Sequence, residues 1–375
     1  MIKTQTQVKF FDYPLQFRIH EEEYKRVIMD VLSRGAFILG AELKSFEENL
    51  AKFVGTKFAI GVGNCTDALL VSLSAAGIKP GDEVITVSHT FVATVEVIKF
   101  LGGTPVFVDI GEDHQMNVDL VEKAITSKTK AIMPVQLNGH ICFKMDKLVE
   151  LANNHGLIII EDSAQALGAT YQGKGAGSFG LSGNFSFYPA KLLGTFGDAG
   201  AVVTNDPEFA DKIWKLRNHG RGHGTDIEMW GLNLRMDNLH AAILNYKLKF
   251  LPDWIKRRRE IAALYHQGLS SIQELTLPPG PNDDPDHYDV FQNYELESDR
   301  RDELIKYLKE HGIDAVIQWG GKAVHQFPAL GLSHHKLPRT EKLFKRSFML
   351  PLYPELENLQ IEHVVDTVRS FYHAR

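Results

Sequence analysis

The sequence GLIIIEDSAQALGA, residues 156–169, contains an apolar run that ends at two carboxylates. Residues 157–160 are apolar without alternation, which is typical of a strand covered on both faces of a parallel sheet. Similar runs and helix-like segments alternate before it, with the runs at 57–63, 82–87, 104–109 and 130–135 and the helix-like segments beginning near 66, 91, 118 and 145. This alternation predicts an α/β fold with a mainly parallel central sheet and helices on both faces.

Other segments extend this fold at both ends of the chain. Amphipathic helices are expected at 21–34 and 42–54, with Gly35 and Gly55 as helix stops. The loop-like sequence LPPGPNDDPDH precedes a second, smaller unit, which is predicted to contain a strand at 288–296 and helices at 298–312 and 356–372. We therefore expect a large domain over residues 1–250 and a smaller C-terminal α/β domain over residues 251–375.

Composition argues against several classes of protein. The 375 residues carry a net charge of −6, and the basic run at 256–259 is expected to be a solvated helix face that binds no nucleic acid. Cys65 and Cys142 show no paired spacing, and glycines separate His219 from His223, so neither a disulfide framework nor a metal site is expected. Without a leader or an apolar span, the protein is expected in the cytoplasm and away from membranes.

The first candidate contact for a ligand follows the first predicted strand. Ligands of an open parallel sheet bind beyond the carboxyl ends of its strands. In GVGNCTDALL, Gly61 and Gly63 lead into a helix whose first turn carries Thr66 and Asp67. Free amides at such a turn suit a phosphate, although a tight turn without a ligand has the same pattern. A dinucleotide fingerprint is incomplete, because Thr66 occupies the place of its third glycine.

Asp162 is the second candidate contact, because it ends the apolar run at 157–160. A carboxylate at this position can cap the turn that follows it. It can also pair with a cationic ring nitrogen and keep that nitrogen protonated. The residues alone leave both interpretations open.

Lys191 is the third candidate, as the one cationic side chain in FSFYPAKLLGTFGDAGAVV, residues 185–203. Most lysines are solvated at the surface. Burial among aromatic and aliphatic neighbours would lower the pKa of this amine below its ordinary value of about 10.4, and a neutral amine can attack a carbonyl. A phosphate cradle, a carboxylate for a ring nitrogen and an imine-forming lysine together meet the requirements of pyridoxal 5'-phosphate (PLP).

The sequence resembles the DegT/StrS-type sugar aminotransferases, which are PLP enzymes of the aspartate-aminotransferase fold. The resemblance extends over nearly the whole chain, in FILGAELKSFEENLAKFVG, GNCTDALLVSL, HTFVATVEVIKFLGGTPVFVDI, TKAIMPVQLNGH, IIIEDSAQALGATYQGKGAGSFG, FSFYPAKLLGTFGDAGAVVTND, LRNHGRG, GLNLRMDNLHAAIL and LPLYPEL. It implies a large PLP-binding domain, a smaller C-terminal domain and a homodimer with shared active sites.

The resemblance also assigns contacts to the PLP ring. Lys191 would hold PLP as a Schiff base and, once the amino donor releases it, move the proton. Asp162 would pair with the ring nitrogen, and Gln165 would bind the ring hydroxyl. Ala164 and Phe91 would lie against the two faces of the ring.

A further set of implied residues would bind the PLP phosphate. Cys65, Thr66 and Ser186 would hold it within one chain, and Asn233 would reach it from the neighbouring subunit. Each residue implied by the resemblance also has an ordinary structural interpretation, as a core residue or a polar cap.

Departures from the family pattern occur at the phosphate contact and on the substrate side of the site. Cys65 stands where the family usually has a small residue, which is compatible with a contact through the backbone amide. PVQLNG replaces the commoner PVHLYG, so that Gln136 and Asn138 take the place of ring-bearing residues near the sugar. His325 matches a histidine position near the sugar-nucleotide site of the family, and both a substrate role and a structural role are open.

These features predict an aminotransferase that moves an amino group from an amino acid, expected to be glutamate, to a nucleotide-linked keto-sugar. Pyridoxamine 5'-phosphate (PMP) would be the cofactor form between the two half-reactions, and the product would serve amino-sugar and polysaccharide biosynthesis. The alternatives are a cyclitol ketone aminotransferase and a non-catalytic regulatory protein of the same fold. Lys191 disfavours a sugar dehydratase of the family, which typically has histidine there.

Overall fold

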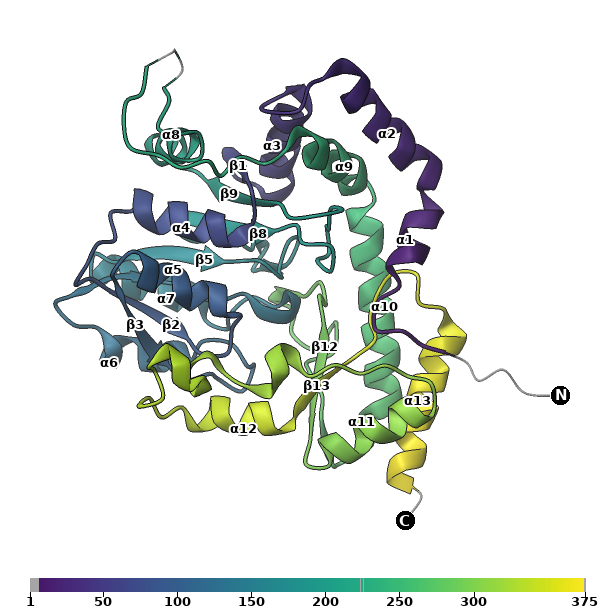
Figure 1. The fold of residues 1–375 in the computed structure, drawn as a ribbon. Helices are drawn as coiled ribbons and strands as arrows, with labels where there is room; N and C mark the ends of the chain where they lie inside the picture. Colours follow the sequence, from purple (N-terminus) through teal and green to yellow (C-terminus); the bar gives the residue numbers. More distant parts are fainter. Residues whose placement is uncertain (1–6, 223, 225, 374–375) are drawn as a thin grey trace.

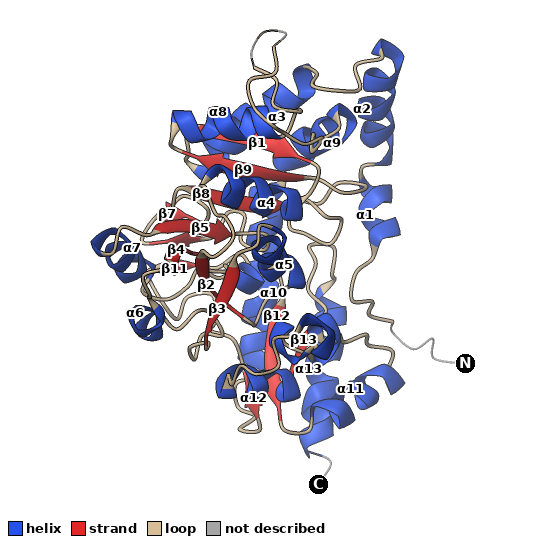
Figure 2. Cartoon of the chain, turned by 60° about the vertical axis from the view of Figure 1, so that its left-hand side comes forward, coloured by secondary structure: helices blue, strands red, loops and turns tan. Residues whose placement is uncertain are grey.

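A seven-stranded sheet forms the centre of the protein, in a computed structural model that describes residues 7–222, 224 and 226–373. Figure 2 shows its strands in the order β1-β9-β8-β5-β4-β2-β3. Their bounds are β1 (Phe58–Val62), β2 (Glu83–Val87), β3 (Thr104–Val108), β4 (Thr129–Ile132), β5 (Ile158–Asp162), β8 (Ser182–Ser186) and β9 (Gly200–Thr204). Only β9 runs antiparallel to its neighbours in this sheet, so the prediction of a mainly parallel sheet is confirmed.

Helices cover both faces of this sheet because each presents an apolar side to it. One face packs against α4 (Cys65–Ala75), α5 (Val92–Phe100) and α8 (Pro207–Leu216). The other packs against α3 (Ala41–Val54), α6 (Val121–Ala124), α7 (Met145–Asn154) and α9 (Asn238–Leu248). The helix predicted at 21–34 is α2 (Glu21–Arg34), and Gly35 and Gly55 adopt left-handed φ angles of 64° and 84° as helix stops.

A second core lies in the C-terminal part of the chain. It packs an antiparallel sheet of β10 (Leu275–Thr276), β12 (Tyr294–Ser298) and β13 (Ser347–Leu350) against α11 (Arg301–Glu310) and α13 (Asn358–His373). The long helix α10 (Leu251–Leu269) runs beside both units (Figure 1), with Ile255 in the first core and Ile261 in the second. Val8 also packs in the second core. The boundary at residue 250 stays a prediction.

The remaining elements of the described residues are short. The helical ones are α1 (Tyr13–Ile19), α12 (Pro338–Arg346) and the 3-10 turns Val118–Leu120, Leu137–Gly139, Gln318–Gly321, Val324–Gln326 and Pro328–Leu330. In a third sheet, β6 (Thr170–Tyr171) lies between β11 (His287–Tyr288) and β7 (Lys174–Gly175).

The single strand predicted at 288–296 is wrong, because the chain leaves extended conformation between β11 and β12. Phe291 has a φ of 49°, in the left-handed region that β-strands do not use. This break turns Gln292 and Asn293 toward the large sheet, where both line a pocket.

The prediction of a solvated helix face at 256–259 is wrong for Arg258, which is 3% exposed. Its Nη1 atom donates to the carbonyl oxygens of Phe291 at 3.1 Å, Gln292 at 3.2 Å and Leu352 at 2.9 Å. Burial lowers the pKa of Arg258 to about 10. The guanidinium thus supplies a donor to two carbonyl groups at the strand break and to the carbonyl group of Leu352, which follows β13.

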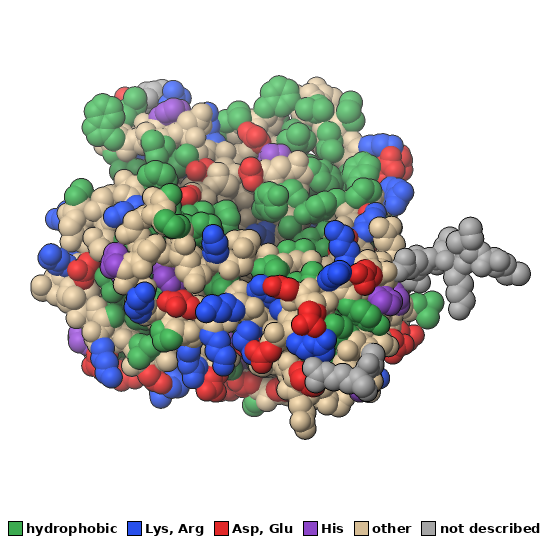
Figure 3. Space-filling view, turned by 60° about the horizontal axis from the view of Figure 1, so that its bottom comes forward, with side chains coloured by type: hydrophobic (Ala, Val, Ile, Leu, Met, Phe, Trp, Pro, Cys, Tyr) green, Lys and Arg blue, Asp and Glu red, His purple; other side chains and the backbone are tan. Residues whose placement is uncertain are grey.

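The surface carries charges of both signs. On the face drawn in Figure 3, acidic and basic side chains are interspersed over the lower part, and hydrophobic side chains gather over the upper part. In the described part of the chain, no helix is both long and apolar enough to cross a membrane.

Arg258→Met is expected to reduce the free energy of unfolding by about 3–5 kcal/mol, because three buried carbonyl oxygens lose their donor. Lys256→Met, at an exposed position of the same helix, is the matched control and should change it by less than about 0.5 kcal/mol. Urea unfolding followed by far-UV circular dichroism measures both changes. Equal losses in the two variants would contradict the role assigned to Arg258.

Candidate active site

A pocket of about 840 Å³ opens at the carboxyl ends of the parallel strands. Most of the predicted site residues line it, namely Cys65, Thr66, Phe91, Asp162, Ala164, Gln165, Ser186 and Lys191. They end or follow β1, β2, β5 and β8, whose carboxyl ends lie at one edge of the sheet. The structure thus brings together residues that lie up to 126 positions apart, from Cys65 to Lys191.

The amino end of α4 forms one corner of the pocket. The Asn64 side chain caps this helix by accepting from Asp67 N at 2.8 Å, and its Nδ2 atom donates to the Asp67 carboxylate at 3.1 Å. Gly200 pairs with Ser186 across β9 and β8. A Cβ atom on Gly200 would lie 2.3 Å from the carbonyl carbon of Asn64, so only glycine allows this approach. Ser186 therefore lies beside the helix start, where backbone amides and hydroxyls suit a phosphate.

Cys65 occupies the first position of α4 with its thiol buried. Burial raises the pKa of this thiol well above its ordinary value. A protonated thiol adds no negative charge to the corner, which is compatible with a phosphate contact through the Cys65 backbone amide.

Asp162 ends β5 and is 5% exposed. Its Oδ1 atom accepts from Ala164 N at 3.2 Å, and its Oδ2 atom accepts from Thr94 Oγ1 at 2.7 Å. Burial raises the pKa of this carboxyl, although both donors and the Lys191 charge oppose the shift. Asp162 caps its turn and also lines the pocket, so the two interpretations left open by the sequence are compatible. A cationic ring nitrogen beside it would favour its ionised form.

Lys191 lies in the segment between β8 and β9 and is half-buried in the pocket wall. Burial lowers the pKa of its amine, and the neighbouring Asp162 carboxylate opposes this shift only in part. The amine is therefore neutral more often than a solvated lysine, as a carbonyl-attacking group requires.

Gln165 presents one defined end of its amide to the pocket. Its Oε1 atom accepts from Asn138 N at 2.8 Å and from Asn293 Nδ2 at 3.3 Å. The Nε2 atom remains available as a donor, which suits a ring hydroxyl oxygen. Phe91 is 53% exposed at the pocket, so its alternative interpretation as a core residue is wrong.

Asn233 and His325 lie outside the pocket lining. Asn233 is exposed and is bridged to Asn218. His325 is 2% exposed, with Nδ1 at 2.8 Å from Ser88 Oγ and Nε2 at 3.4 Å from Glu341 Oε1. These contacts support the structural alternative for His325.

The side chains of Gln136 and Asn138 point into the protein. Gln136 Nε2 donates to Glu161 Oε2 at 3.0 Å, and its Oε1 atom accepts from Cys142 N at 2.8 Å. Asn138 Nδ2 donates to Glu295 Oε2 at 2.9 Å. Gln136 lines the pocket, yet the side chains of both residues are engaged by buried carboxylates of the wall.

The N-terminal segment and the C-terminal unit also line the pocket, with residues that the sequence did not predict, namely Phe10, Phe11, Gln292, Asn293, Gln318 and Trp319. The adjacent polar pair Gln292-Asn293 inside an otherwise strand-like run was the one available signal. Among the described residues, no group of three or more His, Cys, Asp and Glu could hold a metal ion. His223 lies outside the described residues.

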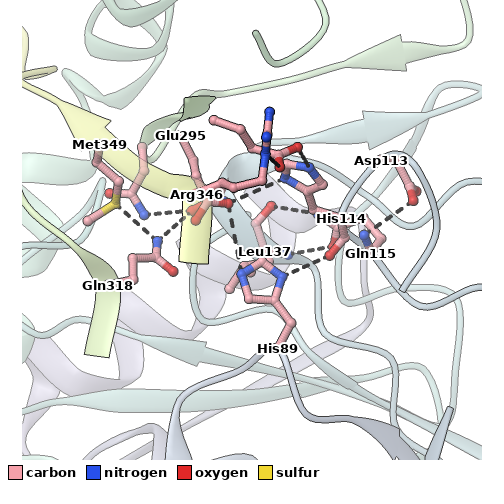
Figure 4. Close-up of polar contacts among 12 residues, drawn as sticks. His89, Asp113, His114, Gln115, Leu137, Glu295, Gln318, Arg346 and Met349 are labelled. Atoms are coloured by element: carbon pink, nitrogen blue, oxygen red, sulfur yellow. Dashed lines mark hydrogen bonds and ion pairs between the residues drawn. The ribbon is translucent and has the colours of Figure 1, made fainter. Parts of the chain in front are cut away.

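A buried ionic network lies behind Gln165, at the junction of the two units. Figure 4 shows Glu295 beside His89 and His114, and Glu297 contacts both His114 and Arg346. His114 Nδ1 lies 3.5 Å from Glu295 Oε2, and His114 Nε2 lies 3.2 Å from Glu297 Oε1. Although burial lowers it, the facing carboxylates raise the pKa of His114 to about 9. The protonated ring therefore joins the large sheet to β12 at neutral pH.

Comparison with known proteins identifies the family of this chain. Residues 18–369 match the DegT/DnrJ/EryC1/StrS aminotransferase family. The chain belongs to this family. The DegT/StrS-type resemblance and the expectation of an aminotransferase are thereby confirmed.

Members of the DegT/DnrJ/EryC1/StrS family resemble the chain over almost their whole length. A dTDP-3-amino-3,4,6-trideoxy-alpha-D-glucose transaminase of Streptomyces venezuelae is 41% identical, with 97% of this chain and 96% of the relative covered. A protein of Geobacillus stearothermophilus named pleiotropic regulatory protein is 40% identical, with 97% and 98% covered.

Solved structures of the family confirm the fold class. S. venezuelae DesV, in complex with a ketimine intermediate, has a TM-score of 0.93 at 41% identity, with 97% of this chain and 98% of that chain covered. A Streptococcus pneumoniae protein described as a sugar aminotransferase, solved in PLP and PMP forms, has a TM-score of 0.87 to each form. Its PLP form is 26% identical, with 94% of this chain and 96% of that chain covered.

His114→Gln is expected to make the stability difference from the native protein depend on pH. The folded pKa of His114, about 9, lies above an unfolded value near 6.5, so its contribution is full below pH 6.5 and is lost as pH rises through 9. The difference in unfolding free energy should shrink by up to about 3 kcal/mol over this range. Urea titrations at pH 6, 7.5 and 9.5 would measure it, with exposed His334→Gln as control. If the difference in unfolding free energy between the two proteins stays constant with pH, a protonated His114 paired with the facing carboxylates is excluded.

Proposed function

We propose that this aminotransferase uses PLP to convert a nucleotide-linked keto-sugar to an amino-sugar, with glutamate as amino donor. The observation that carries this proposal is the meeting of Lys191, Asp162 and the amino end of α4 in one pocket. The names of relatives support the substrate class, because they include a UDP-N-acetyl-3-dehydro-alpha-D-glucosamine 3-aminotransferase and a UDP-2-acetamido-2-deoxy-3-oxo-D-glucuronate aminotransferase, each 36% identical to this chain.

The residues of the pocket suit PLP in their charges and donors. When bound, PLP supplies an electron sink for the carbon that exchanges its amino group. The Thr66 and Ser186 hydroxyls and the amides that begin α4 would hold its phosphate. Asp162 would hold the ring nitrogen protonated, and Gln165 Nε2 would donate to the ring hydroxyl oxygen.

Lys191 would perform two tasks in this reaction. It would anchor the cofactor through Nζ and, when free, would accept a proton at Nζ from one carbon and return it to another. Its lowered pKa favours both tasks, because a permanently protonated amine can neither attack a carbonyl nor accept a proton. The half-buried position also restricts water around the transferred proton.

A homodimer with shared active sites is part of this proposal. Large exposed hydrophobic residues lie near the outer rim of the first sheet, at Phe37, Ile38, Trp230 and Leu232, and Trp230 is 96% exposed. Ile38 is bridged to Asp237, which places it beside the segment that follows Leu232. A second copy would cover this apolar surface and would bring its exposed Asn233 to the phosphate corner. The dimer would act in the cytoplasm.

A non-catalytic regulatory protein of the same fold is the second candidate, favoured by the name of the G. stearothermophilus relative. Regulation alone requires no neutral amine. The combination of Lys191, Asp162 and Gln165 in one pocket therefore favours the aminotransferase.

Lys191→Ala is expected to abolish the visible absorption band that PLP gives with the native protein and to reduce turnover by at least about a thousandfold, because anchoring and proton transfer are both lost. Lys147→Ala, at an exposed position, is the control. Absorption spectra and product analysis with a nucleotide-linked keto-sugar and with a cyclitol ketone would measure the effect. Turnover of the cyclitol alone would contradict the proposed substrate, and an unchanged band in Lys191→Ala would contradict the anchor.

Mixing Lys191→Ala with Asn233→Ala subunits tests the shared site. If Asn233 acts across the interface, half of the randomly exchanged dimers contain one intact site, and activity should reach about a quarter of the native value. Each variant alone, assayed at limiting PLP, should remain far below this value. Activity of the mixture equal to the mean of the two variants would place Asn233 in the site of its own chain.

A further inference from the structure

The segment that carries Lys191 has no regular secondary structure, yet it is fixed in place. Residues 187–199 connect β8 to β9, and Leu192, Leu193 and Thr195 are buried within this segment. Buried peptide groups outside helices and sheets need partners from elsewhere. The partners on both sides of Lys191 come from one side chain.

Gln292 bonds the peptide groups that flank Lys191. Its Oε1 atom accepts from Leu192 N at 2.8 Å, and its Nε2 atom donates to Ala190 O at 2.8 Å. These two bonds define the amide orientation, because the donor and acceptor ends of glutamine are not interchangeable. Gln292 is 3% exposed, so water does not readily substitute for either bond.

Gln292 itself is held from the C-terminal unit. Arg258 Nη1 donates to the carbonyl oxygens of both Phe291 and Gln292, at 3.1 and 3.2 Å. Phe291 adopts a φ of 49°, which turns the backbone out of strand geometry just before Gln292. A strained φ angle of this kind persists where surrounding contacts fix it, and such positions cluster at functional sites.

A second contact holds the other end of the Lys191 segment. Lys247 Nζ, from α9, donates to the carbonyl oxygen of Gly194. A Cβ atom on Gly194 would lie 2.4 Å from Pro189 O, so the segment folds tightly on itself around Lys191. The backbone at Lys191 is therefore restrained from both units, and Gln292 is the restraint nearest to it.

We propose that Gln292 is a positioning residue for Lys191, which fixes the backbone on both sides of the lysine so that its flexible side chain delivers Nζ into the pocket beside Asp162. This inference rests on the role proposed for Lys191. A lysine side chain has four rotatable bonds, so its reach is defined only if its Cα atom is fixed. Displacement of a reacting group by about 1 Å can cost about a hundredfold in rate.

Two substitutions separate positioning from simple packing. Gln292→Met keeps the volume and removes both bonds, whereas Gln292→Glu keeps the acceptor for Leu192 N and loses the donor to Ala190 O. Gln360→Met is the matched control, because Gln360 also bonds a backbone amide and a carbonyl, Glu357 N at 3.1 Å and Gln7 O at 3.2 Å, away from the pocket.

The first measurement uses PLP added to the apo-protein and followed by absorption. In Gln292→Met the visible band should form at least about tenfold more slowly, because Nζ samples positions outside the pocket. The pH midpoint of the band should move upward by about one unit, since a more solvated nitrogen holds its proton more strongly. For both the rate and the pH midpoint of band formation, Gln292→Glu should give values between those of Gln292→Met and the native protein. Gln360→Met should give the native values.

The second measurement separates kcat from KM with the keto-sugar substrate. Turnover in Gln292→Met should fall about 10- to 100-fold, with KM unchanged within about twofold, because the loss concerns the reacting amine and not the substrate contacts. A purely structural role would lower stability without moving the pH midpoint of the band.

The inference is overturned if Gln292→Met, or Gln292→Glu should the first variant not fold, keeps the native rate and pH midpoint of band formation. It is also overturned if Gln360→Met changes the rate and the pH midpoint of band formation as strongly as Gln292→Met does. Failure of the proposed function would look different, because the native protein itself would then form no band with PLP.

Discussion

The site depends on an amine and a carboxylate that share one largely buried edge of the sheet. Asp162 is buried and Lys191 is half-buried, so each charge alone would be unfavourable, and each charge stabilises the other when both are present. Burial lowers the pKa of Lys191 and raises that of Asp162, so both groups are pushed toward neutrality. A cofactor that brings a cationic ring nitrogen and a carbonyl carbon would satisfy the carboxylate and use the neutral amine. The remaining pocket residues orient such a group around this pair.

Both units of the chain contribute to this arrangement. β5 delivers Asp162, and the segment between β8 and β9 delivers Lys191, whereas Gln292 and Asn293 reach the same pocket from the break between β11 and β12. The large sheet thus supplies the chemical groups, and the C-terminal unit fixes how they are held. The network around Glu295 ties the two units together directly behind Gln165. Packing between the units is therefore a condition for the geometry of the site.

Local patterns in the sequence were sufficient for the sheet and for the residues at its edge. Apolar runs predicted β1 to β5, the glycines at 35 and 55 predicted helix ends, and Asp162 and Lys191 were conspicuous as charges in apolar surroundings. Tertiary contacts decided the features that were missed. Nothing local shows that Arg258 would be buried to serve the carbonyls of a broken strand, or that Gln136 would turn to Glu161. Phe91, Gln165 and Ser186 were assigned to the site only through the family resemblance. Taken one at a time, these residues give no signal of a ligand contact.

Treating the PLP-loaded protein with borohydride and mapping the modified peptide by mass spectrometry tests the central claim most directly. Lysines with a lowered pKa compete for the aldehyde, and burial lowers the pKa of Lys247 to about 8. Lys247 donates to Gly194 O and packs among aromatic rings, so its amine is not free to react. The reduced adduct should lie on Lys191 alone. An adduct on Lys247 or on a surface lysine, with Lys191 unmodified, would contradict the assignment of Lys191 as the anchoring amine.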